Sequence, residues 1–275
     1  MSDRPVPELL LTLAREAAVR AGRLLREGRP ADLGVAATKS SPIDVVTEMD
    51  LAAERLITGF LAEHRPDDAF LGEEGGVSGG TSGVRWVVDP LDGTVNYLYG
   101  LPQWAVSIAA EIGDETAVAV VEAPMRGETY HAVLGGGAFR TAADGSSEPL
   151  VPRPSPPLDQ ALIGTGFNYV ATMRTAQAAV ARRLIPRVRD IRRSGSAAID
   201  LCDVAGGRLD GFYERGLAPW DLAAGDLIAR EAGAMTGGRP GRRPDGDLTV
   251  AATPGVFGRL QPLLEELGAW HDDHA

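Results

Sequence analysis

Two aspartates, Asp89 and Asp92, stand three residues apart where a short apolar strand is expected to end. Pro90 holds the residue before it in an extended conformation and lacks a backbone donor, so it is expected to stop the strand. An Asp-Gly pair then turns the chain. The Leu91 carbonyl lies between the two carboxylates, and hard cations such as Mg²⁺ prefer such oxygen ligands. The pattern indicates a cation site.

The residues that follow suit an anion. Thr94 is placed to begin a helix, and the free backbone N–H groups of Gly93 and Thr94 at such a helix start would bind a phosphate. The structural alternative for an isolated segment of this kind is a plain turn with a helix cap. Cation and phosphate ligands side by side favour phosphate chemistry.

Other acidic residues repeat this placement at the ends of expected elements. Glu73 and Glu74 follow a short strand beside a glycine, where a solvated acidic loop is the alternative. Asp221 stands at the head of a helix, where an N-cap is the alternative. Thr47 and Asp50 could form a variant capping box. Each signal is weak alone, and their combination points to one acidic site.

The elements that must position these residues can be read from apolar spacing. An amphipathic helix is expected over 7–27, and a second one follows Thr47. Short apolar runs then predict a mainly antiparallel sheet, at Ala69–Leu71, Val84–Val88, Ala105–Ile112, Ala117–Val121 and Thr129–Val133. The glycine-rich stretch 75–83 is expected to be a mobile loop.

Four prolines within residues 150–157 form the strongest linker signal in the chain. We therefore predict an N-terminal α+β domain over 1–149 and a C-terminal α/β domain over 158–275. Helices and strands alternate in the second half. The strands are expected at Ala161–Thr165, Val188–Ile191, Gly211–Tyr213 and Leu248–Ala252, and the helices at 171–185, 197–206, Asp221–Glu231 and the C-terminal end.

Charge and composition exclude several classes of protein. A net charge of −11 on 275 residues argues against a nucleic-acid partner, and the Arg-rich piece 182–193 is interpreted as a solvated helix face followed by a short strand. Excess acid in an enzyme for an anionic substrate requires bound cations.

The single cysteine, Cys202, is expected to be a buried small hydrophobe. No membrane segment or signal-peptide core is evident, so we expect a cytoplasmic protein.

Four segments in register resemble the inositol monophosphatase family of lithium-sensitive, magnesium-dependent phosphatases. The motifs are Lys39-x-Ser41-Pro42-x-Asp44-x-Val46-Thr47-x-x-Asp50, Gly72-Glu73-Glu74, Trp86-x-x-Asp89-Pro90-x-Asp92-Gly93-Thr94-x-Asn96, and Trp220-Asp221-x-Ala223-Ala224-Gly225. The resemblance implies a layered αβαβα sandwich of the inositol monophosphatase and fructose-1,6-bisphosphatase type, usually dimeric.

The resemblance also implies the metal ligands. One Mg²⁺ would be held by Glu73, Asp89 and the Leu91 carbonyl. A second would be held by Asp89, Asp92 and Asp221, and a third, weaker ion would lie near Glu73. Two ions would activate a water and neutralise the leaving oxygen.

Catalytic and substrate roles follow from the same resemblance. Thr94 and Asp50 would form a dyad that orients the attacking water. The substrate would be contacted by the turn Gly195-Ser196-Ala197, by Glu214 and by Asp221, with Gly93 and Thr94 at the phosphate. Glu214 has a surface strand-end acid as its alternative, and Lys39 is either a phosphate or metal-water contact or an exposed loop lysine. Ala218-Pro219 departs from some inositol-preferring members, which carry a polar side chain there.

The expected activity is hydrolysis of inositol 1-phosphate to inositol and phosphate. The alternative substrates are histidinol phosphate, fructose 1,6-bisphosphate and adenosine 3′,5′-bisphosphate. A non-catalytic, transcription-associated interaction protein is the alternative from a different class.

Overall fold

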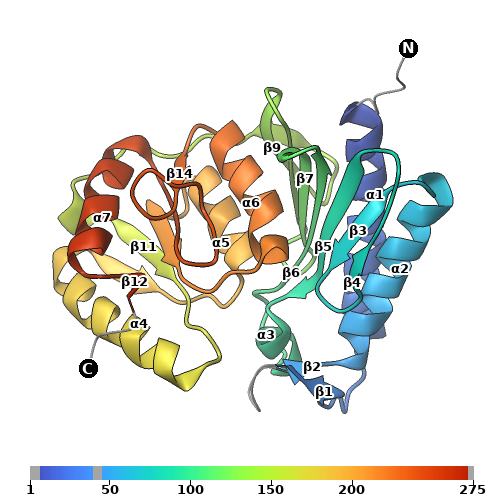
Figure 1. The fold of residues 1–275 in the computed structure, drawn as a ribbon, viewed down its shortest axis with the longest axis horizontal. Helices are drawn as coiled ribbons and strands as arrows, with labels where there is room; N and C mark the ends of the chain where they lie inside the picture. The colour runs from blue at the N-terminus through green and yellow to red at the C-terminus, as the bar shows by residue number, and fades with distance from the viewer. Residues whose placement is uncertain (1–6, 40–44, 272–275) are drawn as a thin grey trace.

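The computed structural model describes residues 7–39 and 45–271. Helices and sheets alternate across the molecule: helices cover the outer face of one sheet, others lie between the two sheets, and others cover the outer face of the second sheet (Figure 1). This is the expected layered αβαβα sandwich. Buried apolar side chains fill each of the four spaces between neighbouring layers.

The first layer consists of α1 (Pro7–Gly28) and α2 (Glu48–His64). Both carry an apolar stripe that packs on the sheet, including Leu10 and Ile57, which are fully buried. The expected capping box begins α2: Thr47 accepts the Met49 N–H through its hydroxyl, and Asp50 Oδ2 accepts the Thr47 N–H at 2.9 Å. The cap places Asp50 in the first turn of α2.

An eight-stranded sheet follows, in the order β10-β9-β8-β7-β6-β5-β3-β4. All neighbours are antiparallel except β3 and β5, which agrees with the expectation of a mainly antiparallel sheet. Its strands are β3 (Ala69–Gly72), β4 (Gly76–Ser78), β5 (Val84–Asp92), β6 (Ala105–Ile112), β7 (Glu115–Ala123), β8 (Glu128–Val133), β9 (Gly137–Ala142) and β10 (Ser147–Pro149). A further small pair, β1 (Ala37–Thr38) and β2 (Val45–Val46), lies beside it.

Two expectations about this sheet are wrong. Strand β5 does not stop at Pro90 but continues to Asp92, because the ladder to β6 skips two residues and resumes after a shift of register between Asp89 and Asp92. Within the stretch 75–83, expected to be a mobile loop, Gly76–Ser78 forms edge strand β4, paired with β3. Neither the bulge nor the edge strand has a strong apolar signature.

The central layer consists of α5 (Ala197–Ala205) and α6 (Pro219–Glu231). Their residues join the core on the inner face of each sheet. The helices approach closely at Gly225, where an added Cβ would lie 2.8 Å from Leu201 Cβ. Helix α6 begins two residues earlier than expected, with Ala218 at the N-cap. Asp221 is therefore the third residue of the helix and not its cap.

The second sheet has five strands in the order β12-β11-β13-β15-β14. Strand β11 is parallel to β12 and β13, and the other neighbours are antiparallel. The strands are β11 (Leu162–Thr165), β12 (Asp190–Arg192), β13 (Gly211–Glu214), β14 (Met235–Gly237) and β15 (Thr249–Ala252). Helices α4 (Ala171–Leu184) and α7 (Pro254–Glu266) cover it. The short elements are α3 (Thr94–Leu98), η1 (Leu158–Gln160) and η2 (Ile185–Arg187).

Other features of the described residues bear on smaller expectations. Residues 150–157 connect the two sheets without forming a helix or strand. Cys202 is fully buried in α5, and burial raises the pKa of its thiol. Arg182 and Arg183 end helix α4 on its exposed side, before the short strand β12. In the described part of the chain, no helix combines the length and apolar character needed to cross a lipid bilayer.

Candidate active site

A cavity of about 290 Å³ lies between the eight-stranded sheet and the second half of the chain. Ten of the twelve residues expected at the site line it: Glu73, Asp89, Leu91, Asp92, Gly93, Thr94, Gly195, Ala197, Glu214 and Asp221. Asp50 and Ser196 lie behind the wall, where each contacts a lining residue. Of the first resemblance motif, Ser41, Pro42 and Asp44 fall outside the described residues.

The carboxylates of the proposed metal ligands Glu73, Asp89, Asp92 and Asp221 all line this cavity. Asp89, at the bulge of β5, is 1 % exposed, and burial together with the charges of Glu73, Asp92 and Asp221 raises its pKa well above the usual range. Burial and the Asp92 charge raise the pKa of Asp221 to about 8. Buried like charges destabilise one another unless a cation compensates them.

The donor set fits a hard cation, because it consists of carboxylate oxygens with a backbone carbonyl beside them. Within residues 7–39 and 45–271, no group of three or more His, Cys, Asp or Glu side chains is drawn together as in a closed metal centre. The carboxylates of Glu73, Asp89, Asp92 and Asp221 nevertheless line one and the same cavity. The charges of Glu73, Asp92 and Asp221 help to raise the pKa of Asp89, so these side chains lie close enough for one cation to compensate them.

Lys39 supplies a positive charge at the mouth of this acidic cluster. Its Nζ donates to Glu73 Oε1 at 2.7 Å and to Glu74 Oε1 at 2.6 Å. The Glu73 and Glu74 charges raise the pKa of Lys39 although its burial opposes them. Lys39 therefore stays charged and lines the cavity; it is not a freely exposed loop lysine.

Thr94 and Asp50 come together although 44 residues separate them. Thr94 Oγ1 lies 2.9 Å from Asp50 Oδ1 and 3.1 Å from the Leu91 carbonyl oxygen. Burial raises the pKa of Asp50, while the hydrogen bonds from Thr47 and Thr94 oppose that rise. When the Thr94 hydroxyl donates to Asp50, its lone pairs are free to accept a hydrogen bond from the cavity.

Gly93 makes the turn between strand β5 and helix α3 possible. Its φ is +98°, and a Cβ there would lie 2.8 Å from the Gln103 carbonyl oxygen. Only glycine meets both requirements without strain. Asn96, in the first turn of α3, donates from Nδ2 to the carbonyls of Gln103 and Ser194, so it anchors the loops on either side of the cavity.

The N-terminus of α5 is attached to Asp92. Asp92 Oδ2 accepts hydrogen bonds from Ser196 Oγ at 2.6 Å and from the Ala198 N–H at 2.8 Å. Ser196 also caps α5 by accepting the Ile199 N–H. Because Ser196 is 2 % exposed, its hydroxyl serves the helix start and not the cavity, whereas Gly195 and Ala197 line the cavity.

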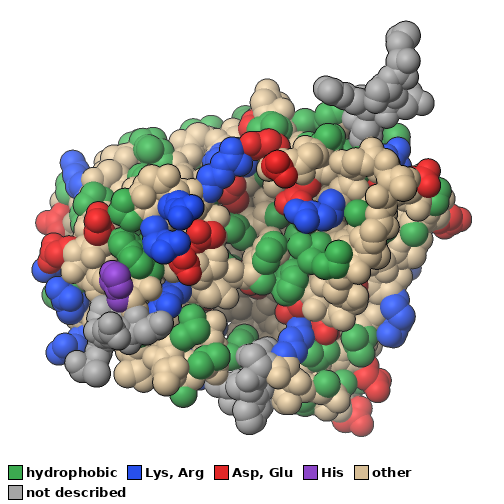
Figure 2. Space-filling view, in the orientation of Figure 1, with side chains coloured by type: hydrophobic (Ala, Val, Ile, Leu, Met, Phe, Trp, Pro, Cys, Tyr) green, Lys and Arg blue, Asp and Glu red, His purple; other side chains and the backbone are tan. Residues whose placement is uncertain are grey.

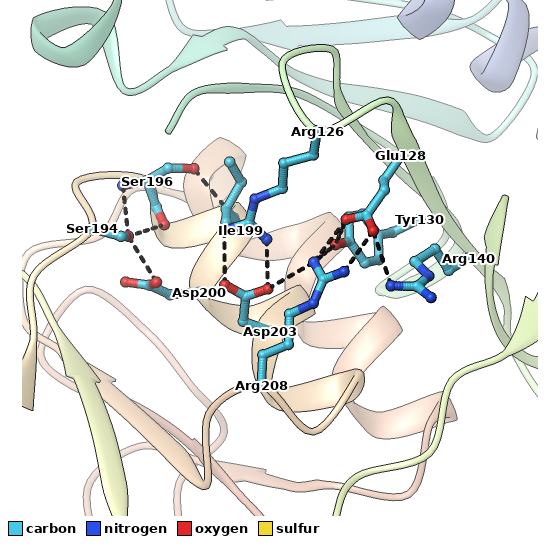
Figure 3. A network of polar contacts seen from close by, with 10 residues as sticks. All are labelled: Arg126, Glu128, Tyr130, Arg140, Ser194, Ser196, Ile199, Asp200, Asp203 and Arg208. Atoms are coloured by element: carbon cyan, nitrogen blue, oxygen red, sulfur yellow. Dashed lines mark hydrogen bonds and ion pairs between the residues drawn. The ribbon is translucent and has the colours of Figure 1, made fainter. Parts of the chain in front are cut away.

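A polar network holds the other end of α5 against the eight-stranded sheet (Figure 3). Asp203 receives two hydrogen bonds from Arg126, at 2.6 and 3.0 Å. Arg208, which follows α5, donates to Glu128 on β8, and Glu128 also binds Arg140. The helix that contacts Asp92 is thus fixed at both ends by residues of the first half.

The second half supplies the remaining wall of the cavity. Burial and the Asp221 charge raise the pKa of Glu214, at the end of β13, to about 8, and Arg193 opposes this rise. Glu214 is therefore a cavity residue and not a surface acid. Asp221 Oδ2 accepts the Ala218 N–H at 2.7 Å, which orients the carboxylate.

Sequence reasoning missed Arg193 and the segment 166–169, all of which line the cavity. Both follow strands of the second sheet, β12 and β11. In sheets with parallel strands, ligands bind at the loops that follow the carboxyl ends of the strands. This rule points to Arg193 and the segment 166–169, but the sequence does not show that β11 and β12 are neighbours.

Comparisons with known proteins agree with this geometry. The model of the inositol monophosphatase family matches residues 7–268. Inositol-1-monophosphatase SuhB of Mycobacterium tuberculosis is 42 % identical over 275 residues, covering 94 % of each chain. The Nus factor SuhB of Pasteurella multocida is 37 % identical, over 94 % of this chain and 97 % of its own. The solved structure of M. tuberculosis SuhB superposes with a TM-score of 0.81 at 40 % identity, covering 96 % of this chain and 99 % of that one.

The layered αβαβα sandwich of this chain is thus the fold of the solved SuhB structure. The chain belongs to the inositol monophosphatase family, whose members are generally metal-dependent.

Proposed function

We propose that this protein hydrolyses a small phosphate monoester in a Mg²⁺-dependent reaction, with inositol 1-phosphate as the substrate and inositol and phosphate as products. The observation that supports the proposal most directly is the convergence of Glu73, Asp89, Asp92 and Asp221 on one cavity beside the Thr94–Asp50 pair. The name of the M. tuberculosis relative favours the same substrate.

The proposed ligands divide between two ions. Glu73, Asp89 and the Leu91 carbonyl would hold one Mg²⁺, and Asp89, Asp92 and Asp221 would hold a second, with room for a weaker third near Glu73. When bound, the ions supply Lewis acidity that activates water and neutralises the leaving oxygen. Magnesium suits these ligands because all of them are oxygens.

The chain's own residues bind and orient the reactants. Thr94, with its hydroxyl proton directed to Asp50, accepts a hydrogen bond from the attacking water and sets its direction. The backbone of Gly93 and Thr94 faces the phosphate, and Lys39 adds a positive charge at the cavity wall. Gly195, Ala197 and Glu214 face the part of the substrate that leaves as an alcohol.

The substrate itself can be tested by measuring phosphate release from a panel of esters, with and without Mg²⁺. Inositol 1-phosphate should have the highest kcat/KM, above histidinol phosphate, fructose 1,6-bisphosphate and adenosine 3′,5′-bisphosphate. Activity should vanish with a chelator and return with added Mg²⁺. If another ester had the highest kcat/KM, that ester would be the substrate and the proposed hydrolysis would still stand. Phosphate release that does not depend on Mg²⁺ would overturn the metal assignment.

The Nus factor name of the P. multocida relative describes that protein. We do not extend it to this chain, because a net charge of −11 opposes contact with a phosphate backbone. On the face shown in Figure 2, acidic and basic side chains are interspersed and form no continuous basic patch. We further propose that the protein is a homodimer and that it is cytoplasmic. Light scattering on the purified protein would test the dimer.

A further inference from the structure

A carboxylate outside the cavity holds the turn that carries Glu73. Glu54, on α2, is 6 % exposed. Its Oε2 accepts the Glu74 N–H at 2.8 Å, and its Oε1 accepts the Gly75 N–H at 2.5 Å. Two backbone donors on one carboxylate are charge-assisted hydrogen bonds, which are stronger than neutral ones.

The preceding amide of the turn is held from the other side. The Glu73 N–H donates to the Val88 carbonyl on β5 at 3.2 Å. Three consecutive backbone N–H groups, at residues 73, 74 and 75, are therefore bound. The first is attached to the strand that leads directly into Asp89, and the other two to α2. This fixes the peptide planes around Glu73 and so the direction of its side chain.

The two glycines of the turn fit the Glu54 carboxylate closely. A Cβ at Gly72 would lie 2.8 Å from Glu54 Oε2, and a Cβ at Gly75 would lie 2.5 Å from Glu54 Oε1. Neither glycine has a positive φ, so their backbone conformation does not require glycine. The close approach of the Glu54 carboxylate does.

Helix α2 carries a second group that acts on the cavity. Asp50 lies one helical turn before Glu54 and receives the hydrogen bond from Thr94. One rigid helix thus orients Thr94 through Asp50 and the turn of Glu73 through Glu54.

We propose that Glu54 is a positioning residue, which sets Glu73 in the geometry needed to bind Mg²⁺. The inference rests on the proposed function for the identity of the metal. Groups that orient metal ligands through hydrogen bonds typically contribute about 10- to 100-fold in metal affinity.

The test is calorimetric titration of Mg²⁺ into the full-length protein without substrate, comparing wild type with Glu54→Gln. Glutamine keeps the size but presents an NH₂ group to one of the two N–H donors. We expect the Mg²⁺ dissociation constant to rise about 10-fold or more, while kcat at saturating Mg²⁺ falls much less. Amide exchange at Glu74 and Gly75 should become faster. Glu63→Gln, on the exposed face of the same helix, is the matched control and should change none of these.

Unchanged Mg²⁺ affinity in Glu54→Gln would overturn the proposal, even if its melting temperature fell, because the contact would then be merely structural. If Glu54→Gln fails to fold, the Mg²⁺ affinity of Gly72→Ala is measured in its place. The added Cβ displaces the Glu54 carboxylate without removing it, so an unchanged Mg²⁺ affinity would again overturn the proposal. Failure of the proposed function is distinguishable, because the wild type itself would then neither bind Mg²⁺ nor release phosphate.

Discussion

At the scale of single residues, several side chains serve two purposes. Asp92 faces the cavity and also caps α5 through Ser196 and the Ala198 N–H. Burial raises the pKa of Asp92 to about 6, although the hydrogen bonds from α5 oppose the rise. A substitution at Asp92 would therefore disturb both the cavity and a helix terminus. Asp221 is the cleaner residue for testing the loss of one charge.

Asp221→Asn should lower turnover by a factor on the order of 10² to 10⁴, the usual effect of removing a charge that stabilises a transition state. Asparagine retains an oxygen that can accept the Ala218 N–H, so the start of α6 should remain intact. Steady-state kinetics at saturating Mg²⁺ measure the rate, and circular dichroism checks the fold. Near-normal turnover would show that Asp221 holds no ion.

Thr94 allows its hydroxyl to be separated from its place at the start of α3. Thr94→Ala should lose at least about 10²-fold in kcat, because it removes the group that orients water, whereas Thr94→Ser should retain most activity. Both variants change the short helix α3 little, since Gly93 and not Thr94 is its N-cap. Equal, small losses in the two variants would leave Thr94 without a role in water activation.

At the scale of elements, the position of α5 depends on the network of Figure 3. The Asp203 and Arg126 side chains are 10 % and 25 % exposed, so their ion pair is partly protected from water. The exposed ion pair of Arg187 and Glu266 has side chains that are 45 % and 56 % exposed. The two pairs have the same chemistry and differ in burial.

Asp203→Ala should lower the free energy of unfolding by about 2 kcal/mol, because it leaves Arg126 partly buried without its partner. Glu266→Ala, the matched control, should cost less than about 0.5 kcal/mol. Alanine is a good helix former, so helix propensity does not account for the difference. Urea denaturation of the three proteins measures both values. Equal losses would mean that the network does not fix α5.

The lowered pKa of Glu128 predicts how the free energy of unfolding changes in acid. Its burial favours the neutral carboxyl, but the Arg208 hydrogen bond and the charges of Arg208 and Arg140 outweigh it and lower the pKa from 4.5 to about 2. The folded protein therefore binds this proton less readily than the unfolded chain. The resulting stabilisation is complete above about pH 4.5 and is lost as the pH falls towards 2.

Glu128→Gln should remove that contribution. The free energy of unfolding of wild type should fall more steeply than that of the variant between about pH 4.5 and 2.5. Urea unfolding at a series of pH values measures both slopes. Parallel slopes would show that the pKa of Glu128 is not lowered in the folded protein.

At the scale of the whole molecule, the cavity exists only because the two halves of the chain meet. Asp89 and Asp92 come from strand β5, whereas Asp221 comes from α6 and Glu214 from β13. The proposed second ion would thus be bound by both halves and would face the bound phosphate.

Lithium inhibition tests that second site. Li⁺ is close to Mg²⁺ in size and also prefers oxygen ligands, so it should occupy the position of Asp89, Asp92 and Asp221. On the proposed assignment the phosphate would complete the pocket, so Li⁺ should bind the occupied enzyme better and inhibit uncompetitively with respect to substrate. Rates are measured across substrate and LiCl concentrations, with NaCl at matched ionic strength as control. Purely competitive inhibition, or none beyond the NaCl control, would count against the site.

The amino-acid sequence alone determined most elements and the acidic character of the site. Alternation along β5 places Trp86 and Val88 in one core and Val87 in the other, and such alternation is a local property. Motif spacing predicted Asp89, Asp92 and Asp221 at the ends of elements, and they lie at the bulge of β5, at its last residue and in the first turn of α6. The stop predicted at Pro90 failed because ladder bonds on both sides of a bulge can tolerate a missing donor.

Only the tertiary structure decided which of these residues meet. The Ser196–Asp92 contact spans 104 residues and the Glu54–Glu74 contact spans 20. Both depend on how helices pack on sheets. Apolar periodicity tells which face of a helix is buried but not what lies opposite, so the sequence did not show that Asp92 accepts hydrogen bonds from the start of α5. Nor did it place Arg193 in the cavity or Glu54 behind Glu73, because those positions follow from strand order and helix packing.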